Sequence, residues 1–148
     1  MTVAAARPPA RGVLGLPLLV VTLAGLGIAG YLTVVRLLGE SPACGPVHGC
    51  DVVSTSEYAT ILGIPVAVLG LGLSVVLVGC ALAWWRRADP RAIRLAYGLL
   101  LLATLAVAYF TFLELFVIHA ICVWCVSYAI ATVSSLVLTG LALRRGIP

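Results

Sequence analysis

Two thiols with redox spacing open the last apolar segment of the chain, in Cys122-Val123-Trp124-Cys125. On a helix, residues three apart lie on the same face. A first thiol at the positive end of the helix dipole has a lowered pKa and a favoured thiolate form. Such a motif is typical of a redox couple, and zinc sites use the same spacing.

A second cysteine pair, Cys44 and Cys50, lies upstream in a polar loop. Gly45, Pro46 and Gly49 favour a compact turn between the two thiols. A disulfide that closes so short a loop is sterically reasonable. The chain therefore offers two dithiol pairs for redox chemistry.

The rest of this loop carries signals for a short helix and for the start of a membrane span. Ser54 and Glu57 have the spacing of a capping box, which predicts a helix that begins there. Gly63-Ile64-Pro65 then interrupts it, and Pro65 suits the first turn of the next span.

The composition is that of an integral membrane protein. Of the 148 residues, 63% are hydrophobic and only 9% are charged. All basic residues are Arg, and the chain has no Lys, Asn or Gln. Because the Arg residues flank apolar runs, the net charge of +4 fits membrane orientation and gives no nucleic-acid-binding face.

The apolar runs predict an all-α membrane protein, a bundle of four transmembrane helices. The spans are expected at about 13–38, 65–85, 95–119 and 122–143. The first run is too long for a signal-peptide core, so it resembles an uncleaved signal anchor. We expect these parts: a cytoplasmic segment 1–12, a four-helix catalytic domain 13–143 with a non-cytoplasmic loop 39–63, and a cytoplasmic tail 144–148.

Arginine asymmetry predicts the orientation. Eight Arg residues fall before the first span, between the second and third, and after the fourth, and only Arg36 lies toward the opposite side. The positive-inside rule then makes both termini cytoplasmic. Both cysteine pairs face the non-cytoplasmic side, where disulfides persist. This orientation suits a bacterial inner membrane.

Two pairs at one membrane face favour a thiol–disulfide relay, in which a mobile loop pair exchanges with a pair on a rigid helix. Two other interpretations stay open: disulfides that only staple the loops of a structural four-span protein, and a tetrathiolate zinc site. An oxidising compartment disfavours the zinc site.

These motifs resemble the vitamin K epoxide reductase family, and its bacterial members more than the vertebrate enzyme. The resemblance rests on Cys44-x5-Cys50, Ser56 six positions later, Gly63-Ile64-Pro65 and the Cys122–Cys125 motif. In the disulfide bond formation protein B family, which also has four spans and two pairs, the Cys-x-x-Cys comes first.

The chain departs from the family in two ways. Many bacterial relatives carry a fused thioredoxin-like domain, whereas this chain stops at Pro148, so the redox partner is expected to be a separate protein. The vertebrate enzyme uses an Asn near the quinone, and this chain has none. This absence argues for quinone reduction over epoxide reduction.

The resemblance implies a membrane thiol–quinone oxidoreductase that drives disulfide formation. Cys44 would exchange with a thioredoxin-fold partner, Cys50 would pass electrons to Cys122, and Cys125 would deliver them to menaquinone or ubiquinone. We also expect Cys122 to be the better thiolate and the more accessible of its pair. The alternatives are a vitamin K or other quinone epoxide reductase and a metal-binding membrane protein.

Further candidates surround these cysteines. For quinone binding they are Ser56, Tyr128, Phe116 and Trp124; for proton relay, His119 and Glu114. Each has a plainer interpretation: Ser56 as a helix cap, Tyr128 and His119 as interface residues, the other aromatics as packing. His48 is expected on an exposed turn, and Cys80 as a buried apolar filler.

Overall fold

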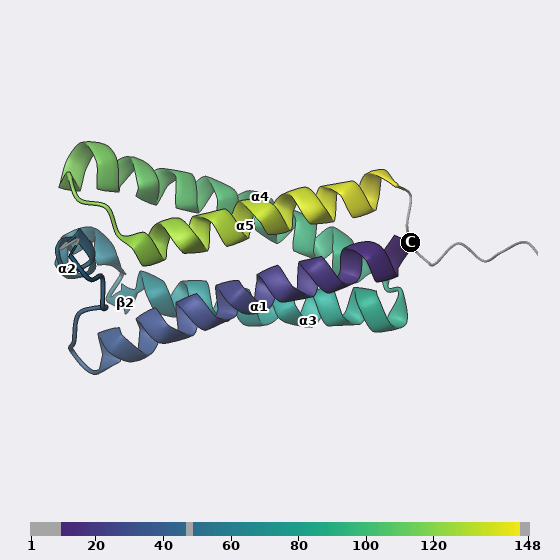
Figure 1. Cartoon of the computed structure of the whole chain (residues 1–148), viewed down its shortest axis with the longest axis horizontal. Coiled ribbons are helices and arrows are strands. Elements are labelled where there is room, and N and C mark those ends of the chain that lie inside the picture. Colours follow the sequence, from purple (N-terminus) through teal and green to yellow (C-terminus); the bar gives the residue numbers. More distant parts are fainter. Residues whose placement is uncertain (1–9, 47–48, 146–148) are drawn as a thin grey trace, which may run out of the picture.

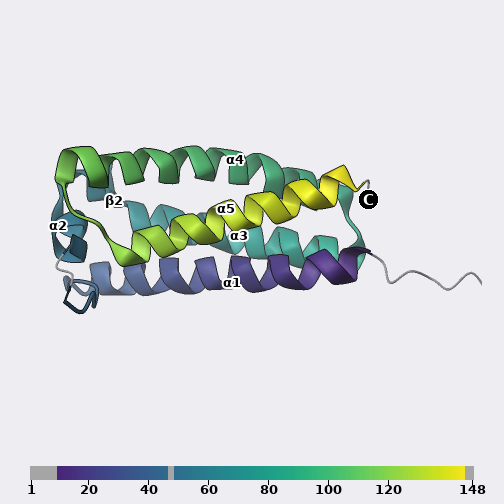
Figure 2. The same cartoon turned by 45° about the horizontal axis from the view of Figure 1, so that its top comes forward.

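Four long helices lie side by side in the computed structural model, which describes residues 10–46 and 49–145 (Figures 1 and 2). They are α1 (Ala10–Leu37), α3 (Val66–Arg87), α4 (Pro90–Phe112), which η2 (Leu113–Ile118) extends as a π-helical turn, and α5 (Val123–Arg144). Each is long and apolar enough to cross a membrane. The predicted all-α bundle of four transmembrane helices is therefore confirmed.

The turn between α3 and α4 is shorter than the sequence suggested. The Asp89 side chain accepts a hydrogen bond from the N–H of Arg91 at 2.9 Å, and Pro90 takes the first helical position. The cap starts α4 at residue 90, five positions before the expected start at 95, so Arg94 lies on a helix. Ala88, in the left-handed conformation, caps the C-terminus of α3, and its N–H donates to the carbonyl of Trp84.

The apolar core is concentrated at the end of the bundle that holds the α3–α4 turn. Its largest fully buried side chains are Leu18, Trp84, Ile93 and Leu100. Cys80 belongs to this cluster with 8% of its surface exposed, which confirms it as a buried apolar filler. At the opposite end, where both cysteine pairs lie, the helices leave a cavity.

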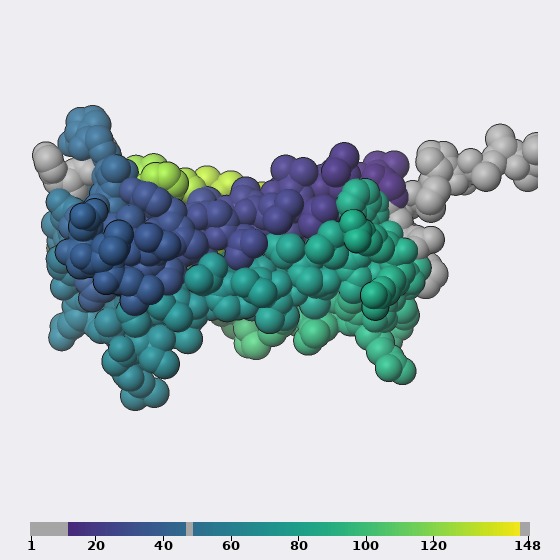
Figure 3. All heavy atoms as spheres, turned by 90° about the horizontal axis from the view of Figure 1, so that it is seen from below, coloured from purple at the N-terminus to yellow at the C-terminus, as the bar shows by residue number. Residues whose placement is uncertain are grey.

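The loop between α1 and α3 folds over that opposite end, where its blue atoms gather in Figure 3. It contains α2 (Gly49–Thr55), η1 (Glu57–Ala59) and a hairpin of β1 (Thr60–Ile61) and β2 (Ile64–Pro65). Leu62 and Gly63 turn the hairpin with φ values of 51° and 83°, the left-handed pair that a tight two-residue turn requires.

The helix start predicted at Ser54 is wrong. Ser54 lies in the last turn of α2, and its hydroxyl donates to the carbonyl of Asp51 at 3.2 Å. Thr55 donates to the same carbonyl at 2.7 Å. Ser and Thr hydroxyls can bond back to carbonyls of their own helix as well as cap the start of a new one, so the spacing of Ser54 and Glu57 did not identify a helix start.

Candidate active site

Cys44 and Cys50 form a disulfide in the loop at the end of the bundle opposite the α3–α4 turn, which we call the cysteine end. Their Cα atoms lie 6.1 Å apart, within the usual range for a disulfide. Cys44 is half-buried, whereas Cys50, in the first turn of α2, has no exposed surface. The first cysteine of the loop is thus the one that a protein in solution can reach.

Cys122 and Cys125 are free thiols at the start of α5. Cys122, the residue before the helix, is only 2% exposed, and Cys125 in the first turn is half-buried. The expectation that Cys122 is the more accessible thiol is therefore wrong. The physical reason is the position of α2, because Gly49 lies directly against the backbone of Ile121 and covers this end of α5.

Cys122 is nonetheless the thiol that favours its charged form. A hydrogen bond from the Cys125 side chain lowers the pKa of Cys122 to about 7, although burial acts in the opposite direction. A pKa near 7 makes Cys122 partly thiolate at neutral pH. This agrees with the sequence-based expectation for Cys122.

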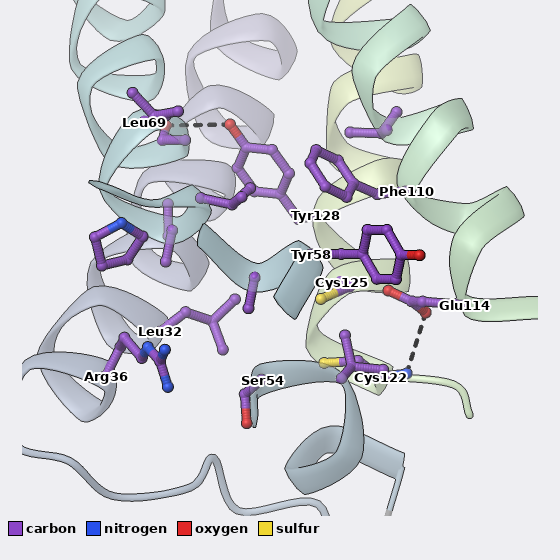
Figure 4. A pocket seen from close by; sticks show the side chains of 18 of the residues that line it. Leu32, Arg36, Ser54, Tyr58, Leu69, Phe110, Glu114, Cys122, Cys125 and Tyr128 are labelled. Carbon is purple, nitrogen blue, oxygen red and sulfur yellow. Dashed lines mark hydrogen bonds between the residues drawn. The ribbon is translucent and has the colours of Figure 1, made fainter. Parts of the chain in front are cut away.

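Glu114 connects the π-helical turn to the redox motif. Its carboxylate accepts a hydrogen bond from the N–H of Cys122 at 3.2 Å (Figure 4), and its carbonyl accepts the N–H of Ala120. The side chain is only 4% exposed. A single π-helical turn changes the direction in which side chains point, and such turns recur at functional sites. Here the turn places a carboxylate beside Cys122.

An apolar cavity of about 330 Å³ adjoins these groups. Its walls come from all four long helices and from the loop that holds η1 (Figure 4). Cys122, Cys125 and Glu114 line one side, and Tyr128 lies farther along α5. The volume falls within the range of small-molecule sites, which are mostly apolar with a few polar groups.

Tyr128 is held by polar contacts to α3. Its hydroxyl donates to the carbonyl of Gly70 at 3.2 Å and lies 3.1 Å from the hydroxyl of Ser74. A Cβ on Gly70 would lie 3.6 Å from the Tyr128 hydroxyl, which is an ordinary van der Waals distance, so the phenol packs closely against this turn of α3. The phenol is thereby fixed as a polar group within an apolar cavity.

The structure brings some of the predicted residues together and separates others. Ser56, Glu114 and Tyr128 line the cavity with both helix cysteines. Ser56 uses its hydroxyl proton in a bond to the carbonyl of Val53 at 2.7 Å, so its oxygen remains an acceptor.

Three other candidates lie outside the cavity lining. Phe116 is 64% exposed and packs against Phe112, with ring centroids 5.0 Å apart. His119 is exposed and ends the π-helical turn with a φ of 55°. Trp124 is half-buried and bonds to the Cys44 loop. His48 lies outside the described residues.

The residues of the cavity wall that sequence reasoning missed include Arg36, Ser54, Tyr58 and Phe110. One signal was available, because Arg36 is the single basic residue at the cysteine end, and charges near membrane depth are frequently functional. Tyr58 lines the same cavity as Glu114 and Cys125 (Figure 4). Its place there depends on the fold of the loop, which leaves no periodic signal.

Among the described residues, no group of three or more His, Cys, Asp or Glu side chains is placed to hold a metal ion. The family model described as vitamin K epoxide reductase family matches residues 16–140, most of the chain. No curated protein matches the chain significantly.

Proposed function

The chain belongs to the vitamin K epoxide reductase family, and we propose that it oxidises a thioredoxin-fold protein and passes the electrons through its two cysteine pairs to a quinone. Membership makes it an integral multi-pass membrane oxidoreductase that acts on thiols, with quinones as substrates and redox proteins as partners. The finer assignment of partner and residues is our proposal.

One observation carries the proposal: Cys122, Cys125 and Tyr128 line the same apolar cavity at the cysteine end of the bundle. A quinone is an apolar ring with two carbonyl acceptors, so it needs apolar walls and a few hydrogen-bond donors. Tyr128 supplies a hydroxyl, and Cys125 supplies a half-buried thiol. Both residues belong to the first two turns of α5.

The first transfer takes place at the loop. A thiolate of the partner attacks Cys44, the half-buried sulfur of the loop disulfide, and Cys50 leaves as a thiolate. The second partner thiol then attacks the mixed disulfide and releases Cys44. The partner leaves with a disulfide, and two electrons and two protons remain on the loop pair.

The second transfer joins the two pairs. Cys50 attacks Cys122 of an oxidised helix pair, and Cys125 leaves; Cys44 then attacks Cys50 and releases Cys122. The loop disulfide is restored, and the helix pair is reduced. The contact between Gly49 and Ile121 supports a short path between the pairs.

The last transfer reduces the quinone. Cys122 and Cys125 form a disulfide and give up two electrons and two protons; the quinone takes up both electrons and two protons, from the thiols or from solvent, and becomes the quinol. Cys125 faces the quinone, and the hydroxyls of Tyr128 and Ser56 turn from the carbonyls of Gly70 and Val53 to donate to its oxygen atoms. Glu114 accepts a thiol proton, since its buried carboxylate lies beside the redox motif. His119 would exchange that proton with solvent from its exposed position.

Phe116 and Trp124 were expected in the quinone site as well. Neither lines the cavity, so we assign them no contact with the quinone ring. We assign Phe116, with its 64% exposure, to the lipid-facing surface beside the cavity. Trp124 contacts the loop that carries Cys44.

We further propose that residues 13–143 form the catalytic domain, with both chain termini in the cytoplasm of a bacterial cell and the protein in its inner membrane. Arg86, Arg87 and Arg144 lie at the end of the bundle opposite the cysteines. Positive residues concentrate on the cytoplasmic side of membrane proteins. Both cysteine pairs then face an oxidising compartment.

The test is stopped-flow absorbance of the purified protein with a reduced thioredoxin-fold protein and either menaquinone or ubiquinone. With the wild-type protein, we expect the quinone absorbance to fall as the quinone is reduced. Cys125→Ala should abolish this reduction, and Tyr128→Phe should raise the KM for the quinone. Tyr97→Phe is the matched control, because Tyr97 contacts Gly140 at the opposite end of the bundle. No reduction of any quinone by the wild-type protein would refute the proposal. Faster turnover with a quinone epoxide would identify an epoxide reductase instead.

A further inference from the structure

Ala43, the residue before Cys44, is held by two aromatic side chains from different helices. The indole N–H of Trp124 on α5 donates to the Ala43 carbonyl at 2.9 Å. The N–H of Ala43 donates to the hydroxyl of Tyr31 on α1 at 3.0 Å. The two rings pack against each other, with centroids 4.6 Å apart. We call this arrangement of Trp124, Tyr31 and Ala43 the aromatic clamp.

Burial does not explain the clamp. Ala43 lies exposed on a loop, where water ordinarily satisfies backbone groups. Direct bonds from two helices to both polar groups of one exposed residue instead fix the position of that residue. They also fix its neighbour, because Cys44 follows Ala43 directly.

The two loop cysteines are held in different ways. Cys50 is fully buried in α2, whose first residue, Gly49, lies against Ile121. Cys44 precedes the helix and is half-buried. When the disulfide opens, Cys44 loses the link through its side chain to α2, and the clamp on the adjacent Ala43 still attaches this part of the loop to α1 and α5.

We propose that Trp124 and Tyr31 are positioning residues for Cys44: they keep its thiol within reach of Cys50 and of the partner protein while the loop pair is reduced. The proposal rests on the proposed function, in which the loop pair opens and closes in each cycle. It also gives Trp124 a role in the motif Cys122-Val123-Trp124-Cys125 that is separate from quinone binding.

The physical consequence is that formation of the clamp and formation of the disulfide are thermodynamically coupled. Two thiols form a disulfide more readily when their effective concentration is high, and a restrained loop raises that concentration. The clamp therefore favours the disulfide, and the disulfide favours the clamp. One hydrogen bond changes such an equilibrium constant by a factor of roughly 2 to 10.

The test measures the equilibrium of the loop disulfide with glutathione. The full chain with Cys122→Ser and Cys125→Ser retains Cys44 and Cys50 as its only exchanging pair, since Cys80 is buried in the core. Trp124→Phe is added to remove the N–H and keep an aromatic ring. Tyr31→Phe, in a separate protein, removes only the hydroxyl that binds Ala43.

Each clamp variant should lower the equilibrium constant for disulfide formation about threefold, and the two together about tenfold, or about 30 mV. Trp85→Phe and Tyr97→Phe are the controls, because both residues lie at the end of the bundle far from the loop disulfide. These two variants should leave the equilibrium constant unchanged. In the protein with all its cysteines, the clamp variants should raise the KM for the partner protein and leave kcat with a small dithiol unchanged.

Unchanged equilibrium constants in both clamp variants would overturn this proposal. That result is separate from failure of the proposed function, because the glutathione equilibrium needs neither a quinone nor a partner protein. A lower constant in the clamp variants together with no quinone reduction by the wild-type protein would refute the proposed function alone.

Discussion

The carboxylate of Glu114 accepts a hydrogen bond from the backbone N–H of Cys122, 3.2 Å away, and so connects the end of the third span to the start of the fourth. The bond spans the reversal of the chain at residues 119–121. Glu114 is 4% exposed and Cys122 is 2% exposed, so water contributes little to the environment of either group. A carboxylate in such a place is suited to proton transfer.

Replacement of Glu114 by Gln distinguishes the role of its carboxylate as a proton acceptor from its role as a hydrogen-bond acceptor. The amide oxygen can still accept the N–H of Cys122, but it cannot take a proton at neutral pH. We expect quinone reduction by the pre-reduced protein to slow about 100-fold in single-turnover stopped-flow experiments. Glu57→Gln, at an exposed loop position, is the matched control. Equal rates in Glu114→Gln and in the wild-type protein would exclude a proton-accepting role.

The Cys122 thiol should titrate near neutral pH. Its pKa is lowered to about 7 by the hydrogen bond from Cys125, so the thiolate fraction rises as the pH passes through 7 instead of 9. The measurement is thiolate absorbance in the ultraviolet, taken as the difference between the wild-type protein and Cys122→Ser. Below pH 7, thiol exchange at Cys122 should slow about tenfold per pH unit.

Cys125→Ala provides the control for this titration. It removes the main group that lowers the pKa of Cys122. The thiolate of Cys122 should then form at a higher pH, closer to the ordinary value for cysteine. If the midpoint stayed near 7 in Cys125→Ala, the helix dipole and not Cys125 would be the cause.

The parts of this protein that follow from local patterns could be predicted from its sequence. Long apolar runs indicated the four spans, and cysteine spacing indicated the loop disulfide that the structure contains. The features that were missed depend on how distant segments meet. Cys122 is less exposed than Cys125 because α2 lies against Ile121, and no pattern near the motif carries that information.

The cavity shows the same limit. Tyr58 and Phe110 line it with Tyr128, although they come from the loop, α4 and α5. Tyr128 was found because it follows Cys125 by almost one helical turn, which is a local relation. Ser54 was assigned to a helix start on spacing alone, whereas its hydroxyl bonds back to Asp51. Hydroxyl side chains serve either end of a helix, so spacing alone cannot decide between the two.

Gly49→Ala should uncouple the two cysteine pairs. A Cβ at this position would overlap the carbonyl of Ile121, so α2 must move away from α5. We expect electron transfer from the partner protein to the quinone to fall at least about tenfold. A small dithiol that reduces Cys122 and Cys125 directly should support unchanged turnover. The two activities are compared in the same stopped-flow assay.

Gly72→Ala is the control for that substitution, because a Cβ at Gly72 meets no atom within 4 Å. It should leave both activities unchanged, and Ala in place of a helical Gly stabilises the helix slightly. If Gly49→Ala retained full activity with the partner protein, a short path between Cys50 and Cys122 would be ruled out.

Reporter fusions should locate both ends of the chain in the cytoplasm. The expected result is activity of a cytoplasmic reporter joined after Arg87 or after Pro148, since Arg residues concentrate at that end of the bundle. A membrane-impermeant maleimide added from outside should label Cys44 after mild reduction. A periplasmic reporter that is active at either fusion point would contradict this orientation and the access of a periplasmic partner.

The relay itself can be trapped as a covalent link between the pairs. Thiol–disulfide exchange between Cys50 and Cys122 passes through a mixed disulfide. In a protein with Cys44→Ala and Cys125→Ala, neither sulfur has the thiol that resolves this bond, so the link should accumulate. Mass spectrometry of non-reduced peptides should detect a Cys50–Cys122 link. Cys80 cannot compete, because it lies in the core roughly 20 Å along α3 from the cysteine end.

The control for the trapping experiment replaces Cys122 by Ala and keeps Cys125. Cys44→Ala with Cys122→Ala leaves Cys50 and Cys125, and a relay that runs through Cys122 predicts no link between them. Equal links in both proteins would mean that the loop pair reaches either helix thiol without preference. Free thiols at Cys50 and Cys122 under oxidising conditions would show that the two cysteine pairs do not exchange with each other. Electrons from the partner protein would then have no route to the quinone.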